Sequence, residues 1–151
     1  MKRLFLIFTL LTMGYLLVQA QVERCCSEFV EGDPELSIDL AEALENPEMI
    51  IVLDLSLQEP KLTKVPEEVA LLINLKCLDV SYNRITSFHE SFKTLENLEC
   101  LDVSGNHYLQ KFPAFLNEMP NLKIVRHVGS IWSAAKKKAT EAEFPNITFV
   151  W

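Results

Sequence analysis

The chain has 151 residues, with 14 lysine and arginine residues against 21 aspartate and glutamate residues and a formal net charge of −7. This acidic balance argues against nucleic-acid binding, which depends on a basic surface. The one basic run, residues 136–138, is typical of a solvated helix face. The length suits one domain rather than several. The sequence has no glycine-rich phosphate loop and no zinc-type spacing of cysteine and histidine, so we expect no cofactor.

The N-terminal 20 residues have the three parts of a secretory signal peptide. Lys2 and Arg3 give a positive start, residues 4–18 are almost entirely apolar, and Ala20 offers a small residue for cleavage. A retained membrane anchor is the alternative, but the apolar run is short for a span of roughly 20 residues. We therefore predict a mature chain of 151 − 20 = 131 residues that is secreted, periplasmic or on the cell surface.

Residues 21–48 form an acidic segment with nine acidic residues and a single basic residue, Arg24. Asp33 and Pro34 suit the N-cap and first position of a helix. An apolar stripe at helical spacing follows them: Leu36, Leu40, Ala43 and Leu44. We predict that this helix covers the N-terminal end of a domain formed by residues 49–151.

An apolar pattern recurs through residues 49–151. In residues 75–85, LKCLDVSYNRI, apolar side chains stand at positions 1, 4, 6 and 11 and an asparagine at position 9. With the further copies, the repeats begin at residues 50, 75, 98, 122 and 147, so their spacings are 25, 23, 24 and 25 residues. The last copy is truncated. The pattern resembles the leucine-rich repeat, whose units are about 20–29 residues long.

The resemblance implies an α/β solenoid, a right-handed leucine-rich repeat horseshoe. Its parallel sheet would line the concave face, short helical or 3-10 segments would line the convex face, and a helix would cap the N-terminus. Asn83 and Asn106 would form a structural ladder that bonds backbone groups at the turns. Residues 133–143 are rich in helix formers, which predicts an α-helix with its lysines outward. Residues 41–56 also look like the entry to short-repeat leucine-rich proteins secreted by some bacteria.

The strand positions that point away from the core form two rows on the predicted concave face. The first row is apolar: Val52, Cys77, Cys100, Ile124 and Phe149. The second row holds Asp54, Asp79, Asp102, Arg126 and Trp151. Just beyond the strands, one shared position is held by Leu57, Tyr82, Gly105 and Gly129. An exposed apolar row suggests a partner, although residues that favour strands also suit these positions for structural reasons alone.

The resemblance implies that binding residues lie on the concave face, so we select the candidate contacts by position. They are Cys77, Asp79, Tyr82, Cys100, Asp102, Ile124, Arg126 and Phe149. Three aspartates on neighbouring strands about 4.8 Å apart repel one another. A cation or a basic partner would relieve that repulsion, but a solvated acidic row is the simpler interpretation. We therefore predict no metal site.

The four cysteines, Cys25, Cys26, Cys77 and Cys100, allow three fully paired disulfide connectivities in an oxidising compartment. Cys77 and Cys100 would stand side by side on neighbouring strands, which leaves a bond between them open. Cys25 and Cys26 either tether the N-terminal segment or remain free. Asn146 lies in a glycosylation sequon that matters only in a host that glycosylates.

No catalytic constellation is evident, so the sequence predicts a non-catalytic module that binds a protein or peptide of unknown identity. One alternative is a self-associating structural or adhesive protein that dimerises through the open sheet edge at the C-terminus. The other is a thiol-active protein that uses Cys77 with Cys100, or Cys25 with Cys26. The sequence predicts no membrane span after residues 1–20 are removed.

Overall fold

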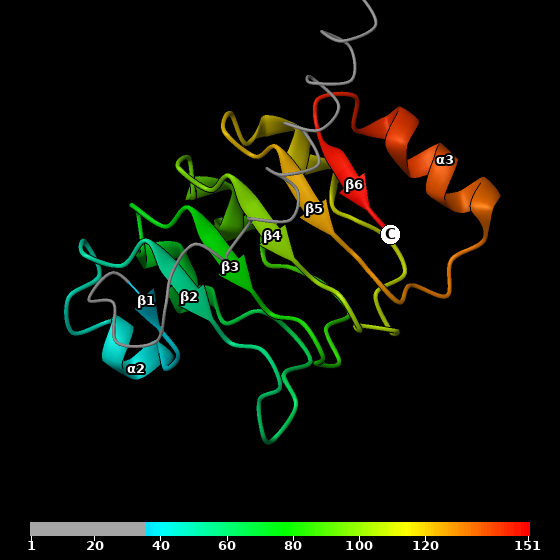
Figure 1. Ribbon diagram of the computed structural model, residues 1–151. Helices are drawn as coiled ribbons and strands as arrows, with labels where there is room; N and C mark the ends of the chain where they lie inside the picture. The colour runs from blue at the N-terminus through cyan, green and yellow to red at the C-terminus, as the bar shows by residue number, and fades with distance from the viewer. Residues whose placement is uncertain (1–35) are drawn as a thin grey trace, which may run out of the picture.

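The computed structural model describes residues 36–151 and contains one six-stranded parallel sheet in the order β1-β2-β3-β4-β5-β6 (Figure 1). The strands are β1 (Leu36–Ser37), β2 (Val52–Asp54), β3 (Cys77–Asp79), β4 (Cys100–Asp102), β5 (Ile124–Arg126) and β6 (Thr148–Val150). Consecutive strands are neighbours throughout, so each repeat adds one strand to the growing sheet. The predicted leucine-rich repeat solenoid is confirmed.

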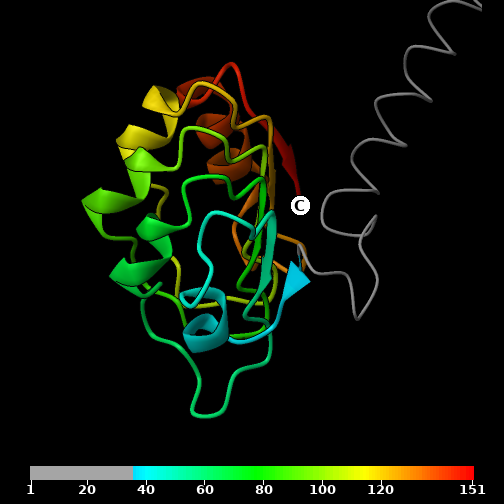
Figure 2. The same cartoon turned by 90° about the vertical axis from the view of Figure 1, so that its left-hand side faces the viewer.

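The return segments all lie on one side of the sheet, as the side view shows (Figure 2). They contain the 3-10 helices Glu67–Leu71, Glu90–Thr94 and Ala114–Glu118, and later the α-helix α3 (Ala134–Glu143). Pro66 and Pro113 precede two of the 3-10 helices, where a fixed φ and a missing N–H cost nothing. Short returns of this kind make the convex side, and the strands make the concave side.

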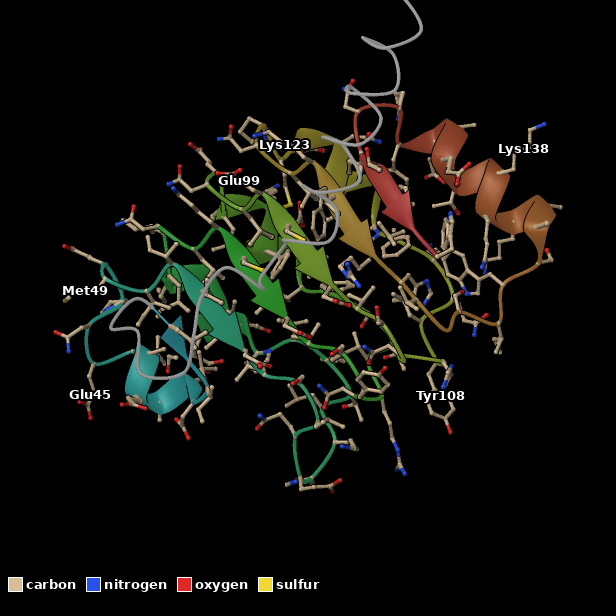
Figure 3. All side chains as sticks on the ribbon, in the orientation of Figure 1. Glu45, Met49, Glu99, Tyr108, Lys123 and Lys138 are labelled. Atoms are coloured by element: carbon tan, nitrogen blue, oxygen red, sulfur yellow. The ribbon has the colours of Figure 1, made fainter. Side chains whose placement is uncertain are left out.

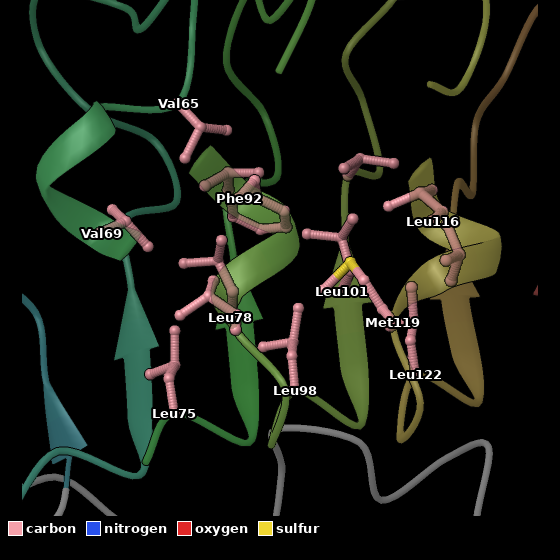
Figure 4. Close-up of a cluster of buried hydrophobic side chains, with 14 of the residues drawn as sticks. Val65, Val69, Leu75, Leu78, Phe92, Leu98, Leu101, Leu116, Met119 and Leu122 are labelled. Carbon is pink, nitrogen blue, oxygen red and sulfur yellow. The ribbon is translucent and has the colours of Figure 1, made fainter. Parts of the chain in front are cut away.

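The hydrophobic core fills the space between these two layers. Strand residues such as Leu78 and Leu101 point toward side chains of the return segments, including Phe92 and Leu116 (Figure 4). All four are at most 3% exposed. Neither layer buries this surface alone, so the stability of each repeat depends on its neighbours.

Asn83 and Asn106 form the predicted ladder at the turns after β3 and β4. The Asn83 amide donates to the carbonyls of Leu55, at 2.8 Å, and Val80, at 3.0 Å, while its oxygen accepts from the Leu62 N–H at 3.1 Å. The side chain of Asn106 repeats this arrangement one repeat further on. Each asparagine therefore satisfies backbone groups of its own repeat and of the preceding one.

A second asparagine ladder stands at the start of the strands, and the sequence analysis missed it. The amides of Asn74, Asn97 and Asn121 donate to the carbonyls of Glu48, Ile73 and Glu96 at 2.8–2.9 Å. The signal in the sequence was an asparagine directly before Leu75, Leu98 and Leu122. The return segments are thus tied to one another at both ends of each strand.

The N-terminal end differs from the expected helix. Leu36 and Ser37 form β1, which pairs with Val52 and Leu53, and the helix α2 spans only Leu40–Ala43. The carboxylate of Asp39 caps α2 by accepting from the Ala41 and Glu42 N–H groups at 2.7 and 3.1 Å. Pairing with β2 satisfies an otherwise open sheet edge, which outweighs the helical pattern of this segment. The predicted cap residues 33–34 lie outside the described residues.

The C-terminal end corrects the register of the last repeat. Phe149 pairs with Val125 and Val150 pairs with Arg126, one position away from the predicted alignment. A one-residue shift turns every side chain to the other face. Phe149 and Trp151 therefore pack against the core rather than on the concave face, with their rings stacked at 5.2 Å. The gain is an aromatic cluster in which both rings are half-buried.

His127 lies inside this aromatic cluster, 1% exposed, at a position held by Leu55, Val80 and Val103 in earlier repeats. Its ring is 5.0–5.9 Å, centroid to centroid, from the rings of Phe112, Trp132 and Trp151. Within residues 36–151, no partner lies in hydrogen-bonding geometry with either ring nitrogen. Burial lowers the pKa of His127 to about 4, against a smaller raising effect of the nearby Asn106 backbone, and the positive charges of Lys137 and Lys136 add to the fall. The side chain is therefore a neutral core histidine.

The predicted helix near the C-terminus is confirmed as α3, with Ser133 as its N-cap. Its lysines do not all point outward as expected. The ammonium of Lys136 lies 3.7 Å from the centroid of the Trp132 ring, and that of Lys137 lies 5.3 Å from the Trp151 ring. These cation–π contacts attach the helix to the aromatic cluster. Within residues 36–151 no helix is long and apolar enough to cross a bilayer.

Candidate functional site: the concave face

The strand register places the predicted rows on the concave face side by side. Val52, Cys77, Cys100 and Ile124 are successive partners, and so are Asp54, Asp79, Asp102 and Arg126. Both rows run across four neighbouring strands, as predicted. Thr148 and Val150 continue them on β6, in place of Phe149 and Trp151.

The apolar row is buried, contrary to the prediction that it is exposed. Val52, Cys77 and Cys100 are 1%, 4% and 3% exposed and form a cluster of their own, separate from the main core. Cys77 and Cys100 are both disulfide-bonded. Ile124, at the end of this row, is half-buried. The candidate contacts Cys77 and Cys100 are thus the least accessible of the set.

The aspartate row consists of Asp54, Asp79 and Asp102, and each carboxylate ends its strand in the same way. Each accepts a hydrogen bond from the N–H two residues later at 2.8–2.9 Å, so it fixes the turn that follows. Arg126 replaces the aspartate on β5, and its Nε donates to the Asp102 carboxylate at 3.0 Å. The row therefore combines a structural role with a surface charge.

Asp79 lies between two other carboxylates of this row and has no described cation beside it. Burial raises the pKa of its carboxyl above the ordinary value, and the neighbouring carboxylates of Asp102 and Asp54 raise it further, against the effect of the hydrogen bonds from Ser81. Among the described residues, no basic side chain makes an ion pair with Asp79. A cationic group brought to this point would lower the electrostatic cost of the row.

Beyond the strands, the chain forms a rim in which four residues share one backbone conformation. Leu57, Tyr82, Gly105 and Gly129 have φ values of 54°, 54°, 69° and 76°. The N–H groups of the first three donate to the next repeat at 2.7–3.1 Å, which aligns the four positions. Leu57 is 62% exposed and Tyr82 is 58% exposed. The edge of the Tyr82 ring lies over Gly105, where a Cβ atom would stand 2.8 Å from Tyr82 Cδ1.

Other exposed apolar side chains occur near the same rim. Tyr108, Val128 and Ile131 are 60%, 40% and 75% exposed. Figure 3 shows Tyr108 beyond the C-terminal ends of the strands, opposite Glu99 and Lys123 at the N-terminal ends. Leu57 shares its repeat position with Tyr82, but it was not among the predicted contacts. The sequence signal that could have identified Leu57 is that two other repeats have glycine at the same position.

The selected residues therefore occupy three kinds of environment. Tyr82 is exposed, whereas Asp79, Asp102, Ile124 and Arg126 are half-buried on the concave face. Cys77 and Cys100 are buried in the apolar row, and Phe149 faces the core. Within residues 36–151, no group of three or more histidine, cysteine or acidic residues is arranged to hold a metal ion.

Comparison with known proteins agrees with this geometry. A family model described as leucine rich repeat matches residues 52–107. A solved structure of a leucine-rich repeat protein of Leptospira interrogans is similar over 77% of this chain, with a TM-score of 0.62 and 21% sequence identity. This chain spans 28% of that structure's chain, so the likeness concerns the fold. No curated protein matches the chain.

Proposed function

We propose, from the premise that this chain is a leucine-rich repeat protein, that it is an exported, non-catalytic module that binds a protein or peptide. Domains of this family generally bind proteins. The contacts that we propose lie on the concave face and along the rim at the C-terminal ends of the strands. The partner would present a cationic group next to an apolar or aromatic surface.

The observation that carries this proposal is the pair of large, exposed side chains at positive φ. An L-residue in the left-handed region costs roughly 1–2 kcal/mol, and glycine avoids that cost. Two repeats use glycine at this position, yet Leu57 and Tyr82 stand there with more than half of their surface exposed. Folding gains little from such side chains. Contact with a partner explains them, since tyrosine is enriched in protein interfaces.

The charge on the concave face supports a basic group in the partner. Asp79 lies between Asp54 and Asp102 on the neighbouring strands, and the three carboxylates raise one another's energy. A lysine or arginine of the partner placed near Asp79 would gain mainly from the carboxylates of Asp79 and Asp54, because Asp102 already pairs with Arg126. Tyr82 follows Asp79 by three residues, so one partner segment can contact both.

The proposal of export rests on two features. Residues 1–20 have the pattern of a signal peptide, and they lie outside the described residues. Cys77 and Cys100 are disulfide-bonded, a state that persists mainly in oxidising compartments. Secretion, a periplasmic location and display on the cell surface all agree with these features.

The test uses the mature protein as bait in extracts of its host, followed by affinity measurements with the captured partner. Leu57→Ala and Leu71→Ala are a matched pair, because the two leucines are 62% and 60% exposed but lie on the rim and on the convex side. We expect Leu57→Ala and Tyr82→Ala to weaken binding about tenfold, equivalent to about 1.4 kcal/mol. Leu71→Ala should leave the affinity unchanged. The opposite pattern would place the interface on the convex side.

A second candidate function is self-association through β6. This strand is the last in the sheet order, and no described strand pairs with its outer side. An open edge is a template for pairing with another chain, which favours a homodimer. A strict monomer in light scattering at millimolar concentration would remove this candidate. A thiol-active function finds less support, because neither Cys77 nor Cys100 has a free thiol.

A further inference from the structure

A second row of side chains follows the rim in the repeats of β2 to β5. Each of its residues directly precedes a residue that packs in the core, so the four positions correspond from repeat to repeat. The backbone bonds agree with this correspondence. The N–H groups of Leu62 and Ile85, which follow the first two members, both donate to a turn asparagine, at 3.1 and 2.8 Å. We call this set the outer row: Lys61, Arg84, Tyr108 and Ile131.

The rim and the outer row share their side-chain types in a regular way. In the repeats of β2 and β3, the rim has a large apolar side chain and the outer row has a cation. In the repeats of β4 and β5, the rim has glycine, and the outer row has Tyr108 and Ile131, which are 60% and 75% exposed. Each of the four repeats therefore presents one exposed apolar side chain at this edge, where Figure 3 shows Tyr108.

Arg84 is the cation of the outer row whose charge no described acidic residue neutralises. The other cation, Lys61, pairs with the carboxylate of Glu59 at 3.1 Å. Arg84 is exposed, and within residues 36–151 no acidic side chain forms an ion pair with its guanidinium. Arginine is enriched in protein interfaces, where its planar group binds carboxylates through two parallel hydrogen bonds. The charge of Arg84 is therefore available to a carboxylate of another molecule.

Asp79 and Arg84 belong to the same repeat, yet they do not pair with each other. Between them in the chain lie Tyr82 and the buried Asn83, whose amide donates to the carbonyl of Leu55 at 2.8 Å and so fixes the turn. Burial raises the pKa of the Asp79 carboxyl, which would gain from a cation beside it. The repeat of β3 thus presents an acidic, an aromatic and a basic side chain in chain order.

We propose that the partner contacts this repeat with a short segment that carries a basic, an apolar and an acidic side chain in turn. The basic side chain pairs with Asp79, the apolar one packs on Tyr82, and the acidic one accepts hydrogen bonds from Arg84. The inference rests on the proposed binding function and adds the signs and the order of the charges in the partner.

The size of the surface agrees with a short segment. Arg84 follows Asp79 by 84 − 79 = 5 residues, so the three groups lie within about 17 Å of one another. A segment of about six residues spans that distance. A partner segment with charges of one sign alone would meet a like charge at one end of this surface, which opposes binding.

The test selects from a library of random short peptides displayed on phage, with the mature, disulfide-bonded chain as the target. We expect enriched peptides to contain a lysine or arginine, an aromatic or aliphatic residue, and an aspartate or glutamate. The most enriched peptide is then synthesised for affinity measurements. Arg84→Glu should weaken its binding about tenfold. Lys138→Glu makes the same change of charge at an exposed lysine of α3 and should leave the affinity unchanged.

Paired substitutions identify which charges meet. Replacing the acidic residue of the peptide by its amide should weaken binding as much as Arg84→Gln does, and the two changes together should weaken it no further. Asp79→Asn keeps an oxygen that can accept from the Ser81 N–H. It should show the same coupling with the basic residue of the peptide. Additive effects in both pairs would overturn the proposal.

The outcomes separate this inference from the proposed function. Binding that depends on Leu57 and Tyr82 but not on Arg84 would overturn the inference and leave the proposed interface intact. Binding that is unchanged by Leu57→Ala, Tyr82→Ala and Arg84→Glu would overturn both. A library that gives no peptide enriched on the native chain over the Tyr82→Ala variant would overturn the inference as well.

Discussion

The central repeats and the last repeat solve the same problem of buried polar backbone groups in different ways. In the repeats of β3 and β4, a buried asparagine satisfies the turn, and a short 3-10 helix returns the chain. In the repeat of β5, Ser130 takes the asparagine position, His127 takes a core position, and the α-helix α3 replaces the 3-10 helix. The last repeat depends on aromatic packing where the central repeats depend on hydrogen bonds.

This difference follows from what each repeat has beside it. A central repeat has a similar repeat on both sides, so an asparagine can serve two turns at once. The repeat of β5 has a full repeat on one side and the short strand β6 on the other, where the rings of Trp132, Phe149 and Trp151 pack together. The two kinds of repeat should therefore respond differently to mutation and to pH.

The largest difference should come from the turn position itself. Asn106→Leu removes the side-chain hydrogen bonds to the carbonyls of Val80 and Val103 and leaves the N–H of Ile85 unpaired. Each lost hydrogen bond costs about 1 kcal/mol and the unpaired buried N–H roughly 1–3 kcal/mol, so the free energy of unfolding should fall by about 4 kcal/mol. Ser130→Ala at the equivalent position loses one bond, from the Trp132 N–H, and should cost about 1 kcal/mol. Urea unfolding of both variants measures this; equal costs would contradict the comparison.

The next effect is the dependence on pH that His127 gives to the repeat of β5. The pKa of His127 is about 4 in the folded protein, below its ordinary 6.5, so its contribution is intact above pH 6.5 and is lost as the pH falls toward 4. The loss in the free energy of unfolding should reach about 3 kcal/mol at pH 4.

His127→Leu serves as the control, because leucine or valine fills this position in the earlier repeats. The difference in unfolding free energy between native and variant protein should change between pH 7 and pH 4. This difference also cancels the opposite effect of Asp79, whose raised pKa favours the folded state as the pH falls. A difference that stays constant with pH would mean that His127 does not remain neutral in the core.

A smaller effect should distinguish the two glycines of the rim. Both have positive φ, so replacement by alanine costs roughly 1 kcal/mol in each case. At Gly105 the new Cβ would also stand 2.8 Å from the Tyr82 ring, whereas at Gly129 no atom lies within 4 Å. We expect Gly105→Ala to lower the free energy of unfolding by about 2 kcal/mol and Gly129→Ala by about 1 kcal/mol. Gly105→Ala combined with Tyr82→Ala should return to the smaller cost.

The smallest effect concerns the lysines of α3. Lys136→Ala removes the cation–π contact with Trp132 and should lower the free energy of unfolding by about 0.5–1 kcal/mol. Lys138→Ala in the same helix removes a solvated side chain and should cost close to nothing. Thermal unfolding at pH 7 separates these two values. Equal melting temperatures for the two variants would show that α3 does not depend on the ring contact.

The repeat pattern predicted the solenoid because its information is local and periodic. The same pattern positions recur at a fixed spacing, as Leu78, Leu101 and the turn asparagines show. In every copy these positions point toward the core. The ends of the chain carry no such repetition. Leu36 fits a helical stripe and a strand equally well, and its pairing with β2 depends on an open edge that a local pattern cannot reveal. The alignment of residues 145–150 with 120–125 failed similarly, because burial of Phe149 and Trp151 decides the register.

The candidate site was predicted in position but not in accessibility. The repeat pattern predicts correctly which face of the sheet Asp79, Tyr82 and Arg126 point to. It does not predict how exposed their side chains are. It cannot report that Cys77 and Cys100 are buried and disulfide-bonded, because both properties depend on contacts made in three dimensions. It also gives no value for φ, so the backbone cost at Leu57 and Tyr82, which marks them as candidate contacts, appears only in the structure.

The contact between Tyr82 and Gly105 limits how a protein of this kind can grow. Repeats of nearly equal length invite gain and loss of whole units by duplication. A second copy of the unit that begins at Cys77, inserted before Cys100, would place a tyrosine where Tyr82 now meets glycine, and its Cβ would collide with the ring. The step from the repeat of β3 to the repeat of β4 therefore requires a small residue after the tyrosine of the rim. Any lengthening of this solenoid at that step must keep a glycine next to Tyr82, or it must begin at another repeat.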